Sequence, residues 1–124
     1  MVREARQRFR FPRSARLTRA SEFRLVKQDG KAFTGRYVVL AVFRPPDETS
    51  VRAGLVTSRR VGPAVVRNRV RRRLREIYRL NRARIGPGWW LVTIARVSAS
   101  SASLAQLQQD WLRLAGRASI LETS

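Results

Sequence analysis

An arginine-rich stretch from Ser58 to Tyr78 constrains the fold of this chain more than any other segment. After Gly62 and Pro63, apolar residues recur at helical spacing and form a single stripe. The stripe consists of Val66, Val70, Leu74 and Ile77. Proline suits the first turn of a helix, because its missing N–H would have no partner there. The stretch therefore predicts a helix that turns one face toward a core.

The opposite face of this expected helix carries positive charge around a single amide. At about 100° per residue, that face collects Asn68, Arg72, Arg75 and Arg79, with Arg71 nearby and Arg67 and Arg69 flanking the apolar stripe. Like charges four residues apart destabilise a bare helix, and only Glu76 offsets them. A charged face that merely contacts solvent explains this pattern poorly. The pattern indicates a phosphate backbone as partner, with Asn68 available for a base edge, a phosphate or a metal-bound water.

The overall charge points the same way. The 124 residues suit one domain and contain 27 basic and 8 acidic side chains, giving a net charge of +19. Such a charge opposes compactness unless a polyanion is the normal partner. Only Lys27 and Lys31 are lysine, which fits either bidentate phosphate recognition or the codon usage of a GC-rich genome. Residues 1–16 read as a flexible basic arm that orders on an anion, or else as a solubilising tail.

The composition leaves little room for a catalytic site in the polypeptide. There is no cysteine and no histidine, so thiolate chemistry, disulfides and the commonest general base are excluded. The acidic residues are scattered, and the adjacent pair Asp47–Glu48 lies in an expected turn. We therefore expect no catalytic residue and no metal site in this chain. No apolar run approaches the length of a membrane span and no secretory signal is present, so the expectation is a soluble cytoplasmic protein.

The remaining segments predict the order α-β-β-β-α-β-α. The first expected helix covers 17–29, is capped by Thr18 or Ser21 and is closed by Gly30. It is followed by strands over 31–33, 36–44 and 51–59, the arginine helix, a loop over 81–88, a strand over 89–95, and a final helix to about residue 115. The strand over 36–44 is apolar on both faces, which is typical of a central strand. The strand–helix–strand unit around the arginine helix predicts a parallel pair. The fold class is thus α+β: a single sandwich with a small mixed sheet, spanning 17–116 and followed by a frayed tail over 117–124.

Aromatic residues offer a second contact for nucleic acid. A sheet face that carries Tyr37 or Phe43 beside Phe23 can stack unpaired bases. All three rings fit a hydrophobic core equally well.

The run R-R-V-G-P-A-V-V-R-N-R-V-R-R-R-L-R-E strongly resembles the RNR motif of the protein subunit of bacterial ribonuclease P. The matching positions are Arg59, Arg60, Gly62, Ala64, Val65, Arg67, Asn68, Arg69, Arg71, Arg72 and Arg75. The resemblance extends over nearly the whole chain, from Arg16-Leu17 and Glu22-Phe23 through Arg36–Val39 and Arg52–Leu55 to Trp90–Arg96.

The resemblance implies a βαβ crossover of the unusual left hand at the arginine helix, against the general rule. It also implies a holoenzyme subunit with endonuclease function, which binds a catalytic RNA and the 5′ leader of precursor tRNA. The RNA then supplies catalysis with Mg²⁺, and no further protein partner is required. The RNA-binding residues by this resemblance are Arg59, Arg60, Arg67, Asn68, Arg69, Arg71, Arg72, Arg75 and Arg79. A leader-binding cleft would contain Phe23, Lys27 and Tyr37, and Lys27 departs from the second aromatic that family members often carry.

Two other functions compete with this interpretation. A non-catalytic basic RNA-binding protein of ribosomal or RNA-chaperone type has the same size, charge and fold class. An independent metal nuclease would need a carboxylate cluster, which the scattered acids do not supply.

Overall fold

The computed structural model of the chain describes residues 15–122, and the basic arm expected over 1–16 falls almost entirely outside them. The helices and strands follow the predicted order α-β-β-β-α-β-α. They are α2 (Ala20–Asp29), β1 (Lys31–Thr34), β2 (Val38–Phe43), β3 (Arg52–Val56), α3 (Ala64–Asn81), β4 (Trp90–Ala95) and α4 (Leu104–Arg117), with short 3₁₀ turns at Arg59–Val61, Arg82–Arg84 and Val97–Ser101. No helix within residues 15–122 is long and apolar enough to cross a membrane.

The four strands form one mixed sheet in the order β1-β2-β4-β3. β2 is antiparallel to both β1 and β4, whereas β3 is parallel to β4. The sheet thus confirms the parallel pair predicted around the arginine helix and the central position of β2. The hand of the β3-α3-β4 crossover stays a prediction.

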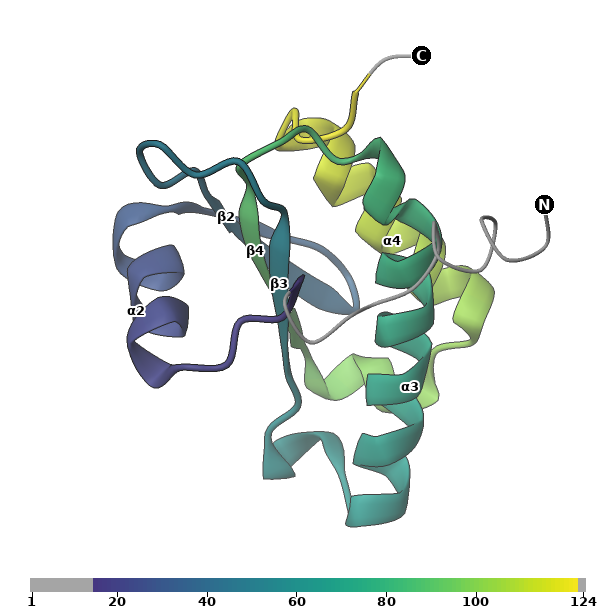
Figure 1. Cartoon of the computed structure of the whole chain (residues 1–124). Coiled ribbons are helices and arrows are strands. Elements are labelled where there is room, and N and C mark those ends of the chain that lie inside the picture. Colours follow the sequence, from purple (N-terminus) through teal and green to yellow (C-terminus); the bar gives the residue numbers. More distant parts are fainter. Residues whose placement is uncertain (1–14, 123–124) are drawn as a thin grey trace, which may run out of the picture.

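Helices cover both faces of the sheet, with α2 on one side and α3 and α4 on the other (Figure 1). The larger core lies under α3 and α4, where Leu74, Ile77 and Trp111 are at most 1% exposed. A smaller core, which contains Val26 and Trp90, lies under α2. Burial of the apolar stripe of α3 confirms the sequence-based orientation of this helix and leaves its charged face outward.

The start of α2 differs from the expected one, whereas its end at Asp29, closed by Gly30, is as predicted. The helix begins at Ala20 with Arg19 as N-cap, and no side chain of the N-cap residue bonds the first turn. Gly30 is extended, with φ −89° and ψ −175°. A Cβ at Gly30 would lie 2.2 Å from the carbonyl oxygen of Val42, so glycine is needed because the backbones of α2 and β2 approach closely.

The C-terminal segment is packed rather than frayed over residues 117–122. Ile120 is 1% exposed, and its carbonyl accepts a hydrogen bond from the Gly86 N–H at 2.8 Å. Leu121 forms a β-bridge with Ile85. The expectation of a frayed tail is wrong for these residues, because one buried isoleucine ties the segment to the loop after α3.

Candidate nucleic-acid interface

The arginine helix α3 starts from a constrained backbone. Gly62 has φ +149°, and a Cβ there would lie 3.2 Å from side-chain atoms of Val66. Pro63 is the N-cap residue with φ −64°. Arg67, one turn into the helix, donates from Nε to the Gly62 carbonyl at 3.1 Å. These contacts fix where the helix begins and so where its charged face lies.

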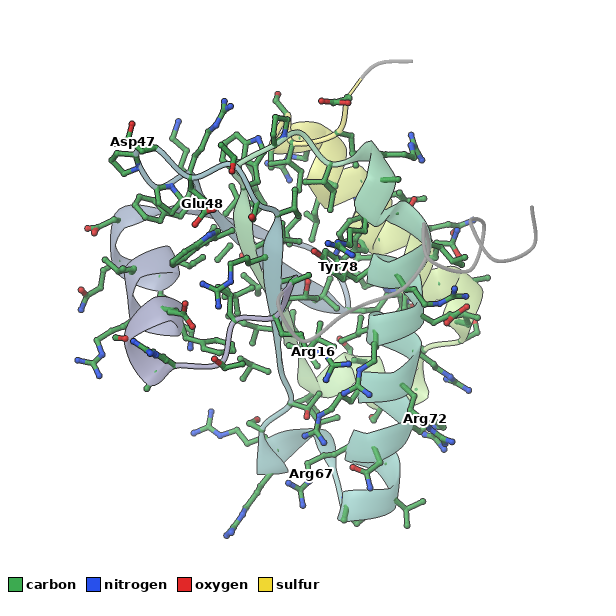
Figure 2. The ribbon with its side chains drawn as sticks, viewed as in Figure 1. Arg16, Asp47, Glu48, Arg67, Arg72 and Tyr78 are labelled. Carbon is green, nitrogen blue, oxygen red and sulfur yellow. The ribbon has the colours of Figure 1, made fainter. Side chains whose placement is uncertain are left out.

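The outer face of α3 is a shallow hollow that combines charge with one apolar side chain. It is lined by Val65, Asn68, Arg71, Arg72 and Arg75. Val65 is 77% exposed, and within residues 15–122 neither Arg72 nor Arg75 has a hydrogen-bond or ion-pair partner. Figure 2 shows Arg72 on the side of α3 that points away from the sheet. This outer face therefore presents unneutralised guanidinium groups to solvent.

Arg71 links the outer face to the end of β3. Its Nη2 donates to the Thr57 hydroxyl at 2.7 Å, and its Nη1 donates to the Asn68 side-chain oxygen at 3.3 Å. The amide is thereby oriented with its NH₂ group available to a ligand.

Other arginines of the helix point inward and bond the protein itself. Arg69 donates to the carbonyl of Ser100 at 2.9 Å, and Arg73 donates to the carbonyl of Ala102 at 2.6 Å. Both acceptors belong to the connection between β4 and α4. The sequence placed Arg69 among the RNA-binding residues, yet the structure directs its guanidinium to this connection.

Arg79 is partly neutralised by its neighbour. Its guanidinium pairs with Glu76 at 2.6 Å, and the hydrogen bond lowers the pKa of the Glu76 carboxyl. Both side chains are more than a third exposed, so the pair adds little stability. Arg59 and Arg60, in the 3₁₀ turn before α3, are exposed.

The α2 side of the sheet holds the first predicted cleft residue. Phe23 is half-buried and lies over Gly54 of β3. A Cβ at Gly54 would come within 2.4 Å of two ring atoms of Phe23, so only glycine lets the ring approach the strand this closely. Lys27, one turn further along α2, is exposed. Phe23 and Lys27 therefore share one helix at the border of the smaller core.

Tyr37 does not join Phe23 in this cleft. It is 9% exposed and belongs to the larger core, whereas Phe23 packs against the smaller one. The backbone N–H of Tyr37 donates to Asp110 Oδ2 at 2.8 Å. The alternation of β2 begins only at Val38. The sequence-based prediction extended this alternation back to Tyr37 and therefore placed its ring beside Phe23, which is wrong.

Asp110 is a buried residue whose role the sequence did not reveal. Its carboxylate accepts hydrogen bonds from the backbone N–H groups of Arg36, Tyr37 and Val38 at 2.8–3.1 Å. Arg113 pairs with it at 2.6 Å. The only signal in the sequence is an acid beside Trp111 within the apolar stripe of α4. The carboxylate anchors the β1–β2 turn to α4.

A polar cluster holds α2 against β3 beside Phe23. Glu22 accepts hydrogen bonds from the N–H groups of Thr18 and Arg19 at 3.0 and 2.9 Å. Its second oxygen pairs with Arg52 at 2.5 Å. The Arg52 guanidinium also lies 5.1 Å from the ring centre of Trp90. The cluster thus fixes the end of α2 that carries Phe23.

The pKa of Glu22 makes this cluster sensitive to acid. Burial alone raises the pKa of its carboxyl, but hydrogen bonds from Arg19, Thr18 and Arg52 outweigh burial, so the pKa lies below its ordinary value of 4.5. A group with a depressed folded-state pKa stabilises the fold above its unfolded-state pKa and loses that effect as pH falls through the folded value. We expect Glu22→Gln to lower the free energy of unfolding at neutral pH, with the difference from the wild type shrinking below about pH 4.5.

Urea unfolding of both proteins across this pH range measures the effect. Glu122→Gln, at an exposed position, is the control and should match the wild type throughout. A Glu22→Gln deficit that stays constant down to pH 3 would contradict the linkage.

Within residues 15–122, no three histidine, cysteine, aspartate or glutamate side chains come together in a way that can hold a metal ion. The two surfaces carry groups suited to nucleic acid: guanidinium groups for phosphates on α3, and an aromatic ring for bases on the α2 side. Fold and surfaces together define a small, basic α+β protein with surfaces suited to nucleic acid.

Comparison with known proteins identifies the family. A model of the ribonuclease P family matches residues 11–119. The ribonuclease P protein component of Clostridioides difficile is 39% identical over 111 residues, covering 89% of this chain and 96% of that protein. That of Chloroflexus aurantiacus is 43% identical over 110 residues, covering 88% and 81%. This chain belongs to the ribonuclease P protein family, the RNA-binding subunits of an endonuclease of tRNA processing.

Solved structures share the fold. The ribonuclease P protein of Thermotoga maritima superposes with a TM-score of 0.72 at 30% identity, covering 82% of this chain and 96% of that one. That of Staphylococcus aureus gives a TM-score of 0.80 at 22% identity, covering 87% and 98%. The α+β sandwich predicted from the sequence is thereby confirmed.

Proposed function

We propose that the outer face of α3 binds the catalytic RNA of ribonuclease P, while Phe23 and Lys27 hold the 5′ leader of precursor tRNA. The observation that carries this proposal is the outer face itself, where Arg72 and Arg75 are exposed and free of protein partners within residues 15–122. Guanidinium groups without carboxylate partners bind phosphate oxygens readily. Arg59, Arg60 and Arg67 extend the same charge toward the start of the helix.

Catalysis belongs to the RNA in this proposal. Neutralising RNA phosphates lowers the repulsion that Mg²⁺ would otherwise offset, so the protein reduces the Mg²⁺ that the RNA requires. The complex removes the leader in the cytoplasm and needs no second protein. Tyr37 has no direct part in leader binding, because its ring packs in the larger core.

Reconstitution tests the proposal. The protein, a bacterial ribonuclease P RNA and labelled precursor tRNA are mixed at low Mg²⁺, and the released leader is measured. Leader release only when both protein and RNA are present supports the proposal. Release without added RNA supports an independent nuclease, and binding to many RNAs with no stimulation of cleavage supports an RNA chaperone.

The leader contact predicts a selective defect. Phe23→Ala should weaken holoenzyme binding to precursor tRNA by about 5- to 100-fold, the effect of one lost base–aromatic stack. Binding to mature tRNA, which has no leader, should be unchanged. Equilibrium binding of both tRNAs to the holoenzyme measures this difference.

Leu25→Ala is the matched control, because Leu25 is a partly exposed apolar residue of the same helix. Thermal unfolding of each variant separates folding from binding, since Phe23→Ala also uncovers Gly54. An equal loss for precursor and mature tRNA would show that Phe23 does not contact the leader.

A further inference from the structure

A second hollow lies at the end of the sheet opposite the start of α3. We call it the distal hollow, and its volume of about 410 Å³ falls within the range of ligand pockets. Its main lining side chains are Lys31, Phe33, Phe43, Arg44, Trp89 and Arg117. They come from β1, the end of β2 and the residue after it, the residue before β4, and the end of α4, which gather in the upper part of Figure 1. Neither α3 nor Phe23 contributes to it.

Two arginine–aromatic pairs give the distal hollow its chemistry. Arg44 lies over the ring of Trp89 and Arg117 lies over the ring of Phe33, each 5.8 Å from the ring centre. Both arginines are exposed, and the rings are half-buried. Unpaired RNA bases stack on aromatic rings and on guanidinium planes, and the same guanidinium groups can bind the adjoining phosphate. The hollow therefore matches a nucleotide of single-stranded RNA.

The charge around the distal hollow favours a polyanion. Lys31, Arg44 and Arg117 face a single lining carboxylate, Asp29. Within residues 15–122, neither arginine is paired with an acid. Binding of a phosphate would therefore displace no ion pair of the protein.

The distal hollow lies at the C-terminal end of α2, the helix that carries Phe23. Asp29 and Gly30 line it at the C-terminal end of α2, and Phe43 packs against the same smaller core as Phe23. Phe33 and Trp89 pack against the larger core instead, so the hollow extends round the end of the sheet. At 1.5 Å per helical residue, Phe23 and Asp29 are about 9 Å apart along α2. α3 begins at the lower end of the molecule in Figure 1. A strand that passes Phe23 and continues along α2, away from the start of α3, meets the distal hollow at Asp29 and Gly30, and it reaches the rings of Phe33 and Trp89 by bending round the end of the sheet.

We propose that the distal hollow binds an unpaired nucleotide of the precursor tRNA leader, farther from the cleavage site than the nucleotide at Phe23. The inference rests on the proposed leader binding at Phe23 and adds a second, separate contact to it. It makes affinity depend on leader length in two steps.

A series of precursor tRNAs tests the inference, with leaders shortened one nucleotide at a time from the 5′ end. Wild-type holoenzyme should gain affinity at two lengths, first when the leader reaches Phe23 and again when it reaches the distal hollow. Arg44→Ala/Arg117→Ala should abolish only the second gain, a loss of about five- to tenfold for long leaders. Phe33→Leu should lower the same gain, because it removes the stacking ring while keeping a large apolar side chain at this position.

The matched control is Arg36→Ala/Arg84→Ala, which removes the same charge at exposed positions outside the hollow. This control should retain both gains. Equal loss at every leader length, or in the control, would overturn the inference. So would weaker assembly with the catalytic RNA that is independent of leader length, because that result assigns the hollow to the other RNA. Absence of the first gain in the wild type would instead refute the proposed function.

Discussion

Arg72→Ala/Arg75→Ala is expected to weaken holoenzyme assembly on the order of ten- to hundredfold, with a higher Mg²⁺ requirement for leader removal. Both side chains are exposed and have no protein partner within residues 15–122, so the variant should remove the proposed RNA contacts without disturbing the fold. Each lost phosphate contact should reduce the slope of log K against log salt by about 0.7–0.9. Titration of the catalytic RNA at several salt concentrations measures both quantities.

The charge-matched variant Arg36→Ala/Arg84→Ala separates a local contact from general attraction. A protein with net charge +19 attracts any polyanion, so the control should lose some affinity as well. Only the variant in α3 should raise the Mg²⁺ requirement. Unchanged assembly and unchanged Mg²⁺ dependence in the α3 variant would refute the assignment of this face to the catalytic RNA.

Asp110→Ala should be among the most destabilising single substitutions in the chain, at about 3–5 kcal/mol. The change leaves the buried N–H groups of Tyr37 and Val38 without an acceptor. Domains of this size are stable by only about 5–15 kcal/mol, so the variant approaches the limit of folding. The midpoint of urea unfolding measures the loss.

Two companion variants of Asp110 test the mechanism. Asp110→Asn retains one acceptor oxygen and should lose less stability than Asp110→Ala. Gln109→Ala alters the preceding, exposed residue of α4 and should unfold like the wild type. A loss below about 1 kcal/mol for Asp110→Ala would show that water replaces the carboxylate at the β1–β2 turn.

Local patterns predicted most of the fold. The apolar stripe of α3 is buried as its spacing required, and β2 is central because both of its faces are apolar. The same periodicity failed at Tyr37, where an acceptor 73 residues away decides the direction of the backbone. No local pattern contains that information, because the turn and α4 meet only in the folded chain.

The binding surfaces were predictable to a lesser degree. A helical projection separated the outer arginines from the apolar stripe, but it could not distinguish Arg69 from Arg71 by partner. The acceptor of Arg69 is a backbone carbonyl in the connection before α4. Every residue has such a carbonyl, so the sequence does not indicate which one accepts the bond. The distal hollow was missed for a related reason. Phe33 and Trp89 come from separate segments of the chain, and each ring is covered by an arginine from another segment.

The hydrogen bonds from Arg69 and Arg73 to the connection before α4 fix the rotation of α3 about its own axis. A shift of one residue would turn the helix by about 100° and swing Arg72 from solvent toward the protein. Because these bonds already hold α3 in this orientation, RNA bound at the proposed face would meet arginines that are already in place, and less ordering would be needed on binding. Neighbouring arginines should therefore tolerate lysine differently: Arg72 needs mainly its charge, whereas Arg73 needs the reach and planar geometry that direct its N–H to one carbonyl.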